Sequence, residues 1–473
     1  MKRTPIQVLV FALLASVDAI ILFARAATQS GTWPLGIYKN QTITMKNFNT
    51  EDNYGGESDG VGEILFEASL TSLTKGELIL GSTNHANAAD GKHNVGAKII
   101  ALQAEQDSIM AELAGLTPPA PAPPPPVFIT YLAEDATQPK LYASDPAGSD
   151  NFGTSVSLHG DTALIGAIKD DDNGIQNSGS VYVFTRSNSA GTFIQHSKIH
   201  ANNAAAEDFF GRSVSLYGDT ALIGAIGDST ATGAVYVFTR SSADGMFTQQ
   251  VKIRASDAAE DNAFGASVSL FKNTALIGAY GINGNRGAVY EFTRPSADAS
   301  SFTQKDKIIA SDAQATDFFG VSVSLYEDTA LIGASGDDDN NLSSSGSVYV
   351  FTRSSADGTF TQRSKFTPNN PGGSDRFGYS VSLHGDTALI GANGATVDDV
   401  YNSGCVYVFT RSSADGTFTE QTQLVPSDSA AFDFFGTSVS LYGNEALIGA
   451  SYDDTNGISN SGSVYVFNSA EAR

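Results

Sequence analysis

Acidic runs recur in this 473-residue chain in a form that suits a bound cation. Each run follows a Gly-Ala pair and combines aspartate with asparagine or glycine. Carboxylate and amide oxygens are the ligands that Ca²⁺ prefers, so the pattern predicts calcium loops. The alternative is a solvated acidic turn, because Asp, Asn and Gly also favour turns. The candidate ligands are Asp170, Asp171, Asp172, Asn173, Asp337, Asp338, Asp339, Asn340, Asp453, Asp454 and Asn456.

No catalytic constellation accompanies these acids. The sequence contains no Ser/His/Asp elbow, P-loop or dinucleotide fingerprint. The single cysteine, Cys405, stands where other copies of the repeat described below have Ser180, Ser347 and Ser463, which indicates a small residue at a strand start rather than a nucleophile. One cysteine also excludes an intramolecular disulfide framework. We therefore expect no enzyme.

A repeat positions the acidic runs. Phe-Gly recurs at intervals of 54 to 58 residues, and each copy reads Phe-Gly-x-Ser-Val-Ser-Leu, a turn, Ala-Leu-Ile-Gly-Ala, a polar loop and a segment like Val-Tyr-Val-Phe. Such a period filled with short strands predicts a propeller or a solenoid. The six copies begin at Phe152, Phe210, Phe264, Phe319, Phe377 and Phe435.

Each copy divides into four strands. In the second copy, alternation over residues 213–216 predicts a half-buried strand, and the apolar run 221–225 predicts an inner strand covered on both sides. Residues 234–238 and 247–253 supply the third and fourth strands. Four antiparallel strands per unit match a propeller blade.

The two ends of the repeat predict ring closure. The last copy stops at Phe467 without a fourth strand, whereas residues 137–145 resemble the fourth-strand segment 303–312. An N-terminal strand would then complete the last blade and bury both edges. The fold class is therefore all-β, a propeller of six four-stranded blades within residues 127–473.

Two further positions recur in the copies. An aspartate two residues before the Phe is expected to cap backbone N–H groups, and the Tyr of Val-Tyr-Val-Phe is expected to pack between blades. The aspartates are Asp150, Asp208, Asp317, Asp375 and Asp433, with Asp261 shifted by one in the third copy.

The motif resembles the FG-GAP repeat of integrin-α-type propellers over residues 135–468. Phe319-Gly320 matches its FG and Gly333-Ala334 its GA, but the Pro is absent from every copy. Such propellers commonly have seven blades, so six departs from the pattern and seven stays possible. Their calcium loop joins the first two strands; here that hairpin, 159–162, is too short to wrap a cation, and the site is not carried over. The resemblance implies extracellular binding or adhesion.

The N-terminal region has features of an export signal followed by a helix and a linker. Lys2 and Arg3 precede the apolar run 8–17, so residues 1–26 are expected to be a signal peptide, or an uncleaved signal anchor. Residues 27–94 suggest no known fold. Residues 95–117 carry apolar residues spaced three and four apart, which predicts a short coiled coil forming a homo-oligomer through residues 99–116, or an amphipathic helix docked on its own domain. Residues 118–126 are a proline-rich linker.

The net charge limits the kinds of partner that the chain can bind. At −24 the chain repels nucleic acid and anionic lipid. We expect a secreted or cell-surface binding or adhesion module that presents loops to an extracellular protein or glycan, with calcium possible. The alternatives are a structural matrix or wall component, and a propeller hydrolase or lyase. An active site would break one copy with a buried charge; the third deviates most, with changes that include Lys272, Arg286 and Glu291.

Overall fold

A computed structural model describes residues 132–188, 191–297, 299–338 and 342–469, and the backbone of β1 (Glu67–Ser69) and β2 (Ile79–Gly81). β1 and β2 pair antiparallel within a first unit, Met1–Val127; the second unit is Phe128–Arg473. The predicted signal, helix and proline-rich linker lie outside the described residues. No helix in the described part of the chain is long and apolar enough to cross a membrane.

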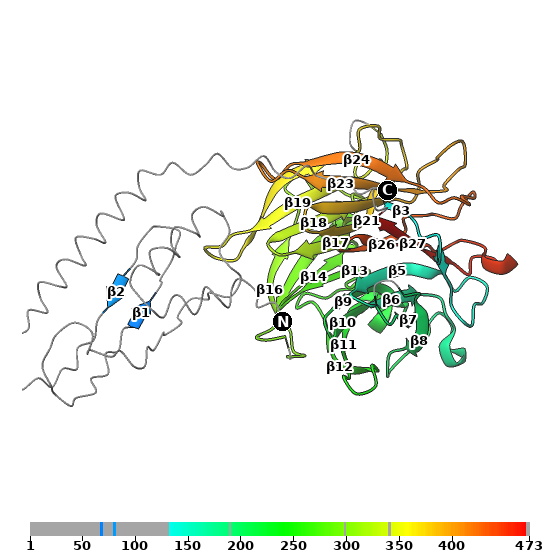
Figure 1. Ribbon diagram of the computed structural model, residues 1–473, viewed down its shortest axis with the longest axis horizontal. Helices are drawn as coiled ribbons and strands as arrows, with labels where there is room; N and C mark the ends of the chain where they lie inside the picture. Colours follow the sequence, from blue (N-terminus) through cyan, green and yellow to red (C-terminus); the bar gives the residue numbers. More distant parts are fainter. Residues whose placement is uncertain are drawn as a thin grey trace, which may run out of the picture. The chain divides into compact units, whose positions relative to one another are not determined.

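Six antiparallel sheets form the second unit (Figure 1). Blade 1 contains β5 (Phe152–His159), β6 (Thr162–Ala167), β7 (Ser180–Thr185) and β8 (Ile194–Ile199). Blade 2 contains β9 (Phe210–Tyr217), β10 (Thr220–Ala225), β11 (Ala234–Arg240) and β12 (Phe247–Ile253). Blade 3 contains β13 (Ser267–Phe271), β14 (Thr274–Ala279), β15 (Ala288–Thr293) and β16 (Thr303–Ile308).

Blade 4 contains β17 (Phe319–Tyr326), β18 (Thr329–Ala334), β19 (Ser347–Arg353) and β20 (Phe360–Phe366). Blade 5 contains β21 (Phe377–His384), β22 (Thr387–Ala392), β23 (Cys405–Arg411) and β24 (Phe418–Leu424). Blade 6 contains β25 (Ser438–Tyr442), β26 (Glu445–Ala450) and β27 (Ser463–Ser469). Single helical turns lie between second and third strands: η3 (Asp172–Gly174), α4 (Asp228–Ala231), α5 (Ile282–Asn285) and η5 (Thr455–Gly457).

The N-terminal strand closes the ring, as the sequence predicts. β3 (Leu132–Glu134) and β4 (Lys140–Leu141) both pair antiparallel with β27 and so supply the fourth strand of blade 6. Figure 1 shows β3 beside β27, although the two lie at opposite ends of the propeller sequence. The prediction of six blades is confirmed for the described residues.

The first strand of each blade corrects one expectation. The sequence predicts a half-buried strand for Ser-Val-Ser-Leu, but both faces are buried. Val214 and Leu216 pack in the hydrophobic cluster shared with the preceding blade, while Ser213 and Ser215 face the following one. The physical reason is that every blade is covered on both sides by neighbours. In this strand the apolar residues face the preceding blade and the serines face the following blade, so both faces are buried.

The two serines form closed rings of hydrogen bonds between blades. The hydroxyl of the first serine donates to the Gly carbonyl of the next Phe-Gly at 2.7–2.8 Å, ending with Ser438 and Gly153. The hydroxyl of the second accepts the N–H of a leucine in the next blade at 2.8–2.9 Å, ending with Ser440 and Leu158. Twelve buried polar contacts therefore fix how the blades are rotated against one another.

Aromatic side chains complete a third ring at the hairpins that join first and second strands. Neighbouring ring centroids are 4.9–5.3 Å apart and their planes are inclined by 51–64°, close to the 60° that separates six equal blades. Such tilted contacts between aromatic rings are favourable. We call this the aromatic collar; its members are His159, Tyr217, Phe271, Tyr326, His384 and Tyr442.

The two collar histidines predict a loss of stability in mild acid. Burial lowers the pKa of both, and Arg240 and His384 lower that of His159 further. The unfolded chain therefore binds more protons than the folded chain below the ordinary histidine pKa of about 6.5, so stability falls as pH drops through that value. We expect His159→Tyr/His384→Tyr, which copies Tyr217 and Tyr442, to reduce the fall in melting temperature between pH 7.5 and pH 5.5.

The control for this prediction is His196→Gln. His196 is exposed and occupies the position that Gln250 has in blade 2. Thermal melts of the three proteins across the pH range decide the matter. An unchanged pH profile in the double variant would show that the collar histidines do not control acid stability.

Candidate functional site

The loops between second and third strands, and those that lead into each Phe-Gly, lie at the same end of every blade; we call this end the loop face. The first acid of each acidic run lies there beside a lysine of the fourth strand. In blade 1, Asp170 Oδ2 is 2.6 Å from Lys198 Nζ, which also lies 3.1 Å from Asp145 Oδ2. The hydroxyl of Tyr182 donates to Asp145 at 2.9 Å.

The charges of this cluster support one another. Burial is the largest influence on Lys198 and would lower its pKa, but hydrogen bonds to Asp170 and Asp145 outweigh burial and raise it. Burial would likewise raise the pKa of Asp145, yet hydrogen bonds from Tyr182 and Lys198 hold it below its usual value. Burial raises the pKa of Tyr182, and the neighbouring carboxylates raise it further. At neutral pH the ammonium group of Lys198 is therefore charged and lies between the carboxylates of Asp170 and Asp145.

The same arrangement recurs around the ring. Asp337 Oδ2 is 2.5 Å from Lys365 Nζ and Asp453 Oδ2 is 2.8 Å from Lys140 Nζ. In blade 2 the lysine is Lys252, paired with Asp228, and in blade 3 it is Lys307, paired with Asp257. The sequence interpretation missed these lysines. The available signal was their recurrence at one place in the fourth strand of five blades.

The second acid of each run holds its own loop in shape. The Oδ1 atoms of Asp171, Asp338 and Asp454 each accept the backbone N–H six residues further on, at 2.7–2.8 Å. This bond closes the loop upon itself. Three candidate calcium ligands thus have a structural use that is identical in blades 1, 4 and 6.

The remaining candidates are spread more widely. Asp172 Oδ2 lies 3.4 Å from His200 Nδ1 and accepts a 2.6 Å hydrogen bond from Asn173. Asp339, Asn340 and the side chain of Asn456 lie outside the described residues. In the part of the chain that is described, no three His, Cys, Asp or Glu side chains gather as a metal site requires. Calcium binding stays a prediction, with the added condition that an ion at the first acid displaces a lysine.

Blade 5 replaces the cluster with neutral residues. Ala395 stands in place of the first acid, Cys405 in place of Ser347, and Gln423 in place of Lys365. The acid and the lysine are lost together, so the charge stays balanced. Loss of either one alone would leave the other as an unpaired buried charge. Cys405 is fully buried, and burial raises the pKa of its thiol to about 12. It is a packed small residue, as the sequence predicts.

The aspartates before Phe-Gly cap their loops, as predicted. Asp150 Oδ2 accepts the N–H of Ala147 at 2.8 Å, and Asp208, Asp317, Asp375 and Asp433 repeat this bond. Burial raises the pKa of all five. Blade 3 differs: Asp261 is exposed in a left-handed conformation, and Asn262 takes the position of the capping aspartate.

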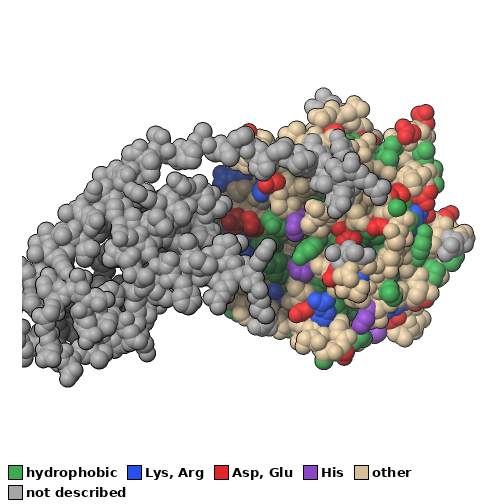
Figure 2. All heavy atoms as spheres, viewed as in Figure 1, with side chains coloured by type: hydrophobic (Ala, Val, Ile, Leu, Met, Phe, Trp, Pro, Cys, Tyr) green, Lys and Arg blue, Asp and Glu red, His purple; other side chains and the backbone are tan. Residues whose placement is uncertain are grey.

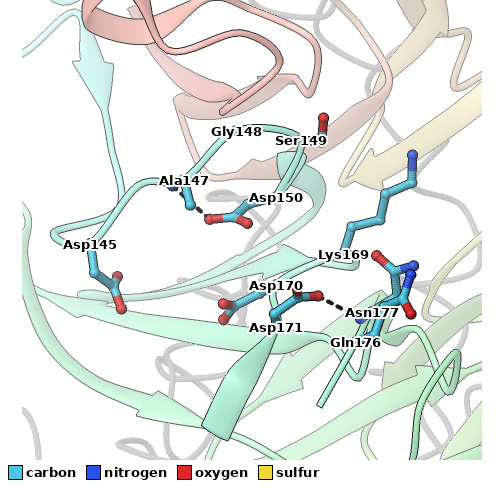
Figure 3. A pocket seen from close by; sticks show the side chains of 10 residues that line it. All are labelled: Asp145, Ala147, Gly148, Ser149, Asp150, Lys169, Asp170, Asp171, Gln176 and Asn177. Carbon is cyan, nitrogen blue, oxygen red and sulfur yellow. Dashed lines mark hydrogen bonds between the residues drawn. The ribbon is translucent and has the colours of Figure 1, made fainter. Parts of the chain in front are cut away.

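The cap and the acidic run enclose a pocket of about 370 Å³ in blade 1 (Figure 3). Figure 3 shows Asp150 bonded to Ala147 on one wall and Asp171 bonded to Asn177 on the other. Asp145, Lys169 and Asp170 also line it. Its lining is polar and includes four aspartates and one lysine, so it suits water, a cation or a polar group rather than an apolar ligand.

Glu291 is the buried charge that breaks the repeat. It replaces the second valine of Val-Tyr-Val-Phe and has no exposed surface. Its Oε1 is 3.1 Å from Lys305 Nζ and 4.0 Å from Arg353 Nη1 of blade 4. The carboxylate therefore lies between blades 3 and 4. Glu291, one of the residues by which the third copy deviates, thus forms an ionic contact between two blades.

The comparison with protein families agrees with this architecture. A family model described as FG-GAP repeat matches residues 136–184, 193–238, 247–292, 302–351, 360–409 and 418–467. A search of curated proteins found no match. Among solved structures, the chain is similar to that of "a putative 6-phosphogluconolactonase from Bacteroides uniformis", with 12% identity, a TM-score of 0.42, and coverage of 63% of this chain and 78% of that chain.

Each matched segment begins near the fourth strand of one blade and ends with the third strand of the next. The first one contains β4, the strand that closes the ring. Together the six segments cover more than half of the chain and coincide with the six blades, and on this ground the protein belongs to the FG-GAP repeat family.

Proposed function

We propose that the protein is a secreted or cell-surface module that binds an extracellular protein or glycan through its loop face. FG-GAP propellers suggest binding as the general role, and the export-like N-terminus and acidic composition support an extracellular setting. A propeller hydrolase or lyase stays an alternative, because Glu291 is the kind of buried charge in one copy that an active site would require; its ion pair with Lys305 at 3.1 Å gives it a structural use instead. A structural matrix component stays the second candidate.

The difference between the two ends of the propeller carries this proposal. The first two strands of every blade are joined by a two-residue hairpin, for example residues 160–161 and 385–386. On the loop face, the loops between second and third strands are longer and vary, from the eight residues 280–287 with a net charge of +1 in blade 3 to the twelve residues 335–346 with a net charge of −3 in blade 4. Variable loops on a rigid scaffold are where binding residues concentrate.

Site-directed shielding tests the proposal. Because Cys405 is buried, a cysteine introduced on the surface can be labelled alone with maleimide-polyethylene glycol. Ser343→Cys places the polymer on the loop face, and Asp386→Cys places it at a hairpin; both side chains are exposed. The labelled proteins are assayed against arrays of extracellular glycans and matrix proteins, with calcium and with chelator.

We expect saturable binding that is lost when the polymer is at position 343 and retained when it is at 386. Binding that survives both labels, or no saturable binding at all, would contradict the proposal, and the latter would favour a structural component. A requirement for calcium would identify the acidic runs as metal loops. Equal binding in chelator would leave them as the ion-paired loops described above.

A further inference from the structure

The loop face carries a group of four contacting aromatic side chains on blades 5 and 6, three of which are exposed. Tyr401, Phe432, Phe434 and Tyr452 form a chain of edge contacts, with ring centroids 5.3, 6.3 and 5.1 Å apart. Tyr401, Phe432 and Tyr452 are 59, 52 and 39% exposed. Below, these four residues are called the aromatic patch. Contiguous apolar surface of this kind marks interaction sites on soluble proteins.

The fold does not require these aromatics. The N–H of Phe432 donates to the carbonyl of Tyr401 at 3.1 Å, and Glu207 and Gln176 make the same bond in blade 2's entry loop at 3.0 Å. The equivalents of Phe432 in blades 1, 4 and 5 are Ser149, Thr316 and Ser374, all with the same left-handed backbone. A bulky residue with φ near 70° is strained relative to these small or polar ones. Blade 6 thus holds a half-exposed phenylalanine whose ring contacts are with other members of the aromatic patch.

Carboxylates flank the aromatic patch. Asp398 and Asp399 are exposed on the loop that carries Tyr401, and Asp454 is exposed two residues after Tyr452. Among the described residues, none of the three is ion-paired with a basic side chain. In Figure 1 these loops project at the right-hand end, where Figure 2 shows hydrophobic and acidic side chains together.

We propose that the aromatic patch binds an arginine- or lysine-bearing segment of a partner protein; this inference rests on the proposed binding function of the loop face. A guanidinium group stacks on the face of Tyr or Phe and pairs with carboxylates through its planar N–H groups. Aromatic anchors surrounded by complementary charge are the usual core of a binding interface. A neutral glycan would donate hydroxyl hydrogen bonds to these carboxylates but leave their negative charge unneutralised, whereas a cationic segment does both, which is why we favour it.

The test uses the full chain and a fluorescein-labelled nona-arginine peptide, measured by anisotropy in 150 mM salt, with nona-glutamate as the peptide control. The variant Tyr401→Gln/Phe432→Ser installs Gln176 and Ser149, the residues of blade 1 at the same positions. The matched control is Ile194→Thr, an exposed apolar residue of β8 that other blades replace with Thr, such as Thr248. Melting temperatures establish that each variant is folded.

We expect the double variant to weaken nona-arginine binding by at least tenfold, and Asp398→Asn/Asp399→Asn to weaken it with intact aromatics. Equal binding by wild type and double variant would overturn the inference, because attraction by net charge alone would then explain it. Absence of binding to wild type would also overturn it. A chitin hexasaccharide that binds wild type but not the double variant would overturn the cationic partner while leaving a loop-face binding function intact.

Discussion

Replacing Gly333 with alanine is expected to unfold the propeller or lower its melting temperature severely. Gly333 lies at the end of β18, facing blade 5, where an added Cβ would stand 1.9 Å from the carbonyl oxygen of Gly378 and 2.3 Å from Ser322 Oγ. The serine and carbonyl are themselves joined by the inter-blade hydrogen bond. Overpacking a rigid site of this kind costs about 3 kcal/mol or more. Urea or thermal unfolding measures the loss.

Gly385→Ala is the matched control. Gly385 occupies a two-residue hairpin with φ of 61°, and nothing lies within 4 Å of an added Cβ. Only the left-handed backbone opposes the methyl group, at about 1 kcal/mol. Lys272 and Glu327 occupy the same hairpin position in blades 3 and 4 with φ of 54°, which shows that the fold accepts a side chain there. Equal destabilisation by the two substitutions would refute close blade contact as the reason for the Gly-Ala motif.

Repetition made the architecture predictable. Six Phe-Gly copies define six blades, and the likeness of residues 137–145 to a fourth strand defines where the ring closes. The four strands of blade 2 follow from apolar runs and turn residues, and β12 has the bounds that the sequence predicts. These features are local or recur in sequence, so one chain is enough to find them.

Contacts between blades were less accessible from the sequence. The serines of Ser-Val-Ser-Leu look like the solvent side of a strand, because the alternation does not reveal that a second blade covers that side. The acidic runs look like calcium loops because the lysine that meets Asp170 lies on the fourth strand, at Lys198. Asp170 and Lys198 meet only because the fourth strand folds back beside the loop that carries Asp170. The partners of a charged residue depend on such long-range geometry.

Removal of the closing strand is the second change with a large expected effect. A chain that begins at residue 143 lacks β3 and β4 and leaves the edge of β27 unpaired. It loses the burial of Leu141, worth about 1.5–3 kcal/mol, and the ion pairs of Lys140 with Asp428 and Asp453. The backbone bond from Val466 N–H to Pro139 is lost as well. We expect a much lower melting temperature and aggregation through the open edge.

A chain that begins at residue 128 keeps both strands, starts where the second unit starts, and is expected to melt cooperatively at high temperature. A further arm separates loss of closure from general damage: a synthetic peptide of residues 130–145, added to the shorter chain, should pair with β27 as an incoming strand and raise the melting temperature in proportion to its concentration. If the two chains melt alike, the rings of serine bonds hold the propeller without the strand. If the shorter chain is unstable and the peptide has no effect, the N-terminal segment acts during folding rather than by closing the finished ring.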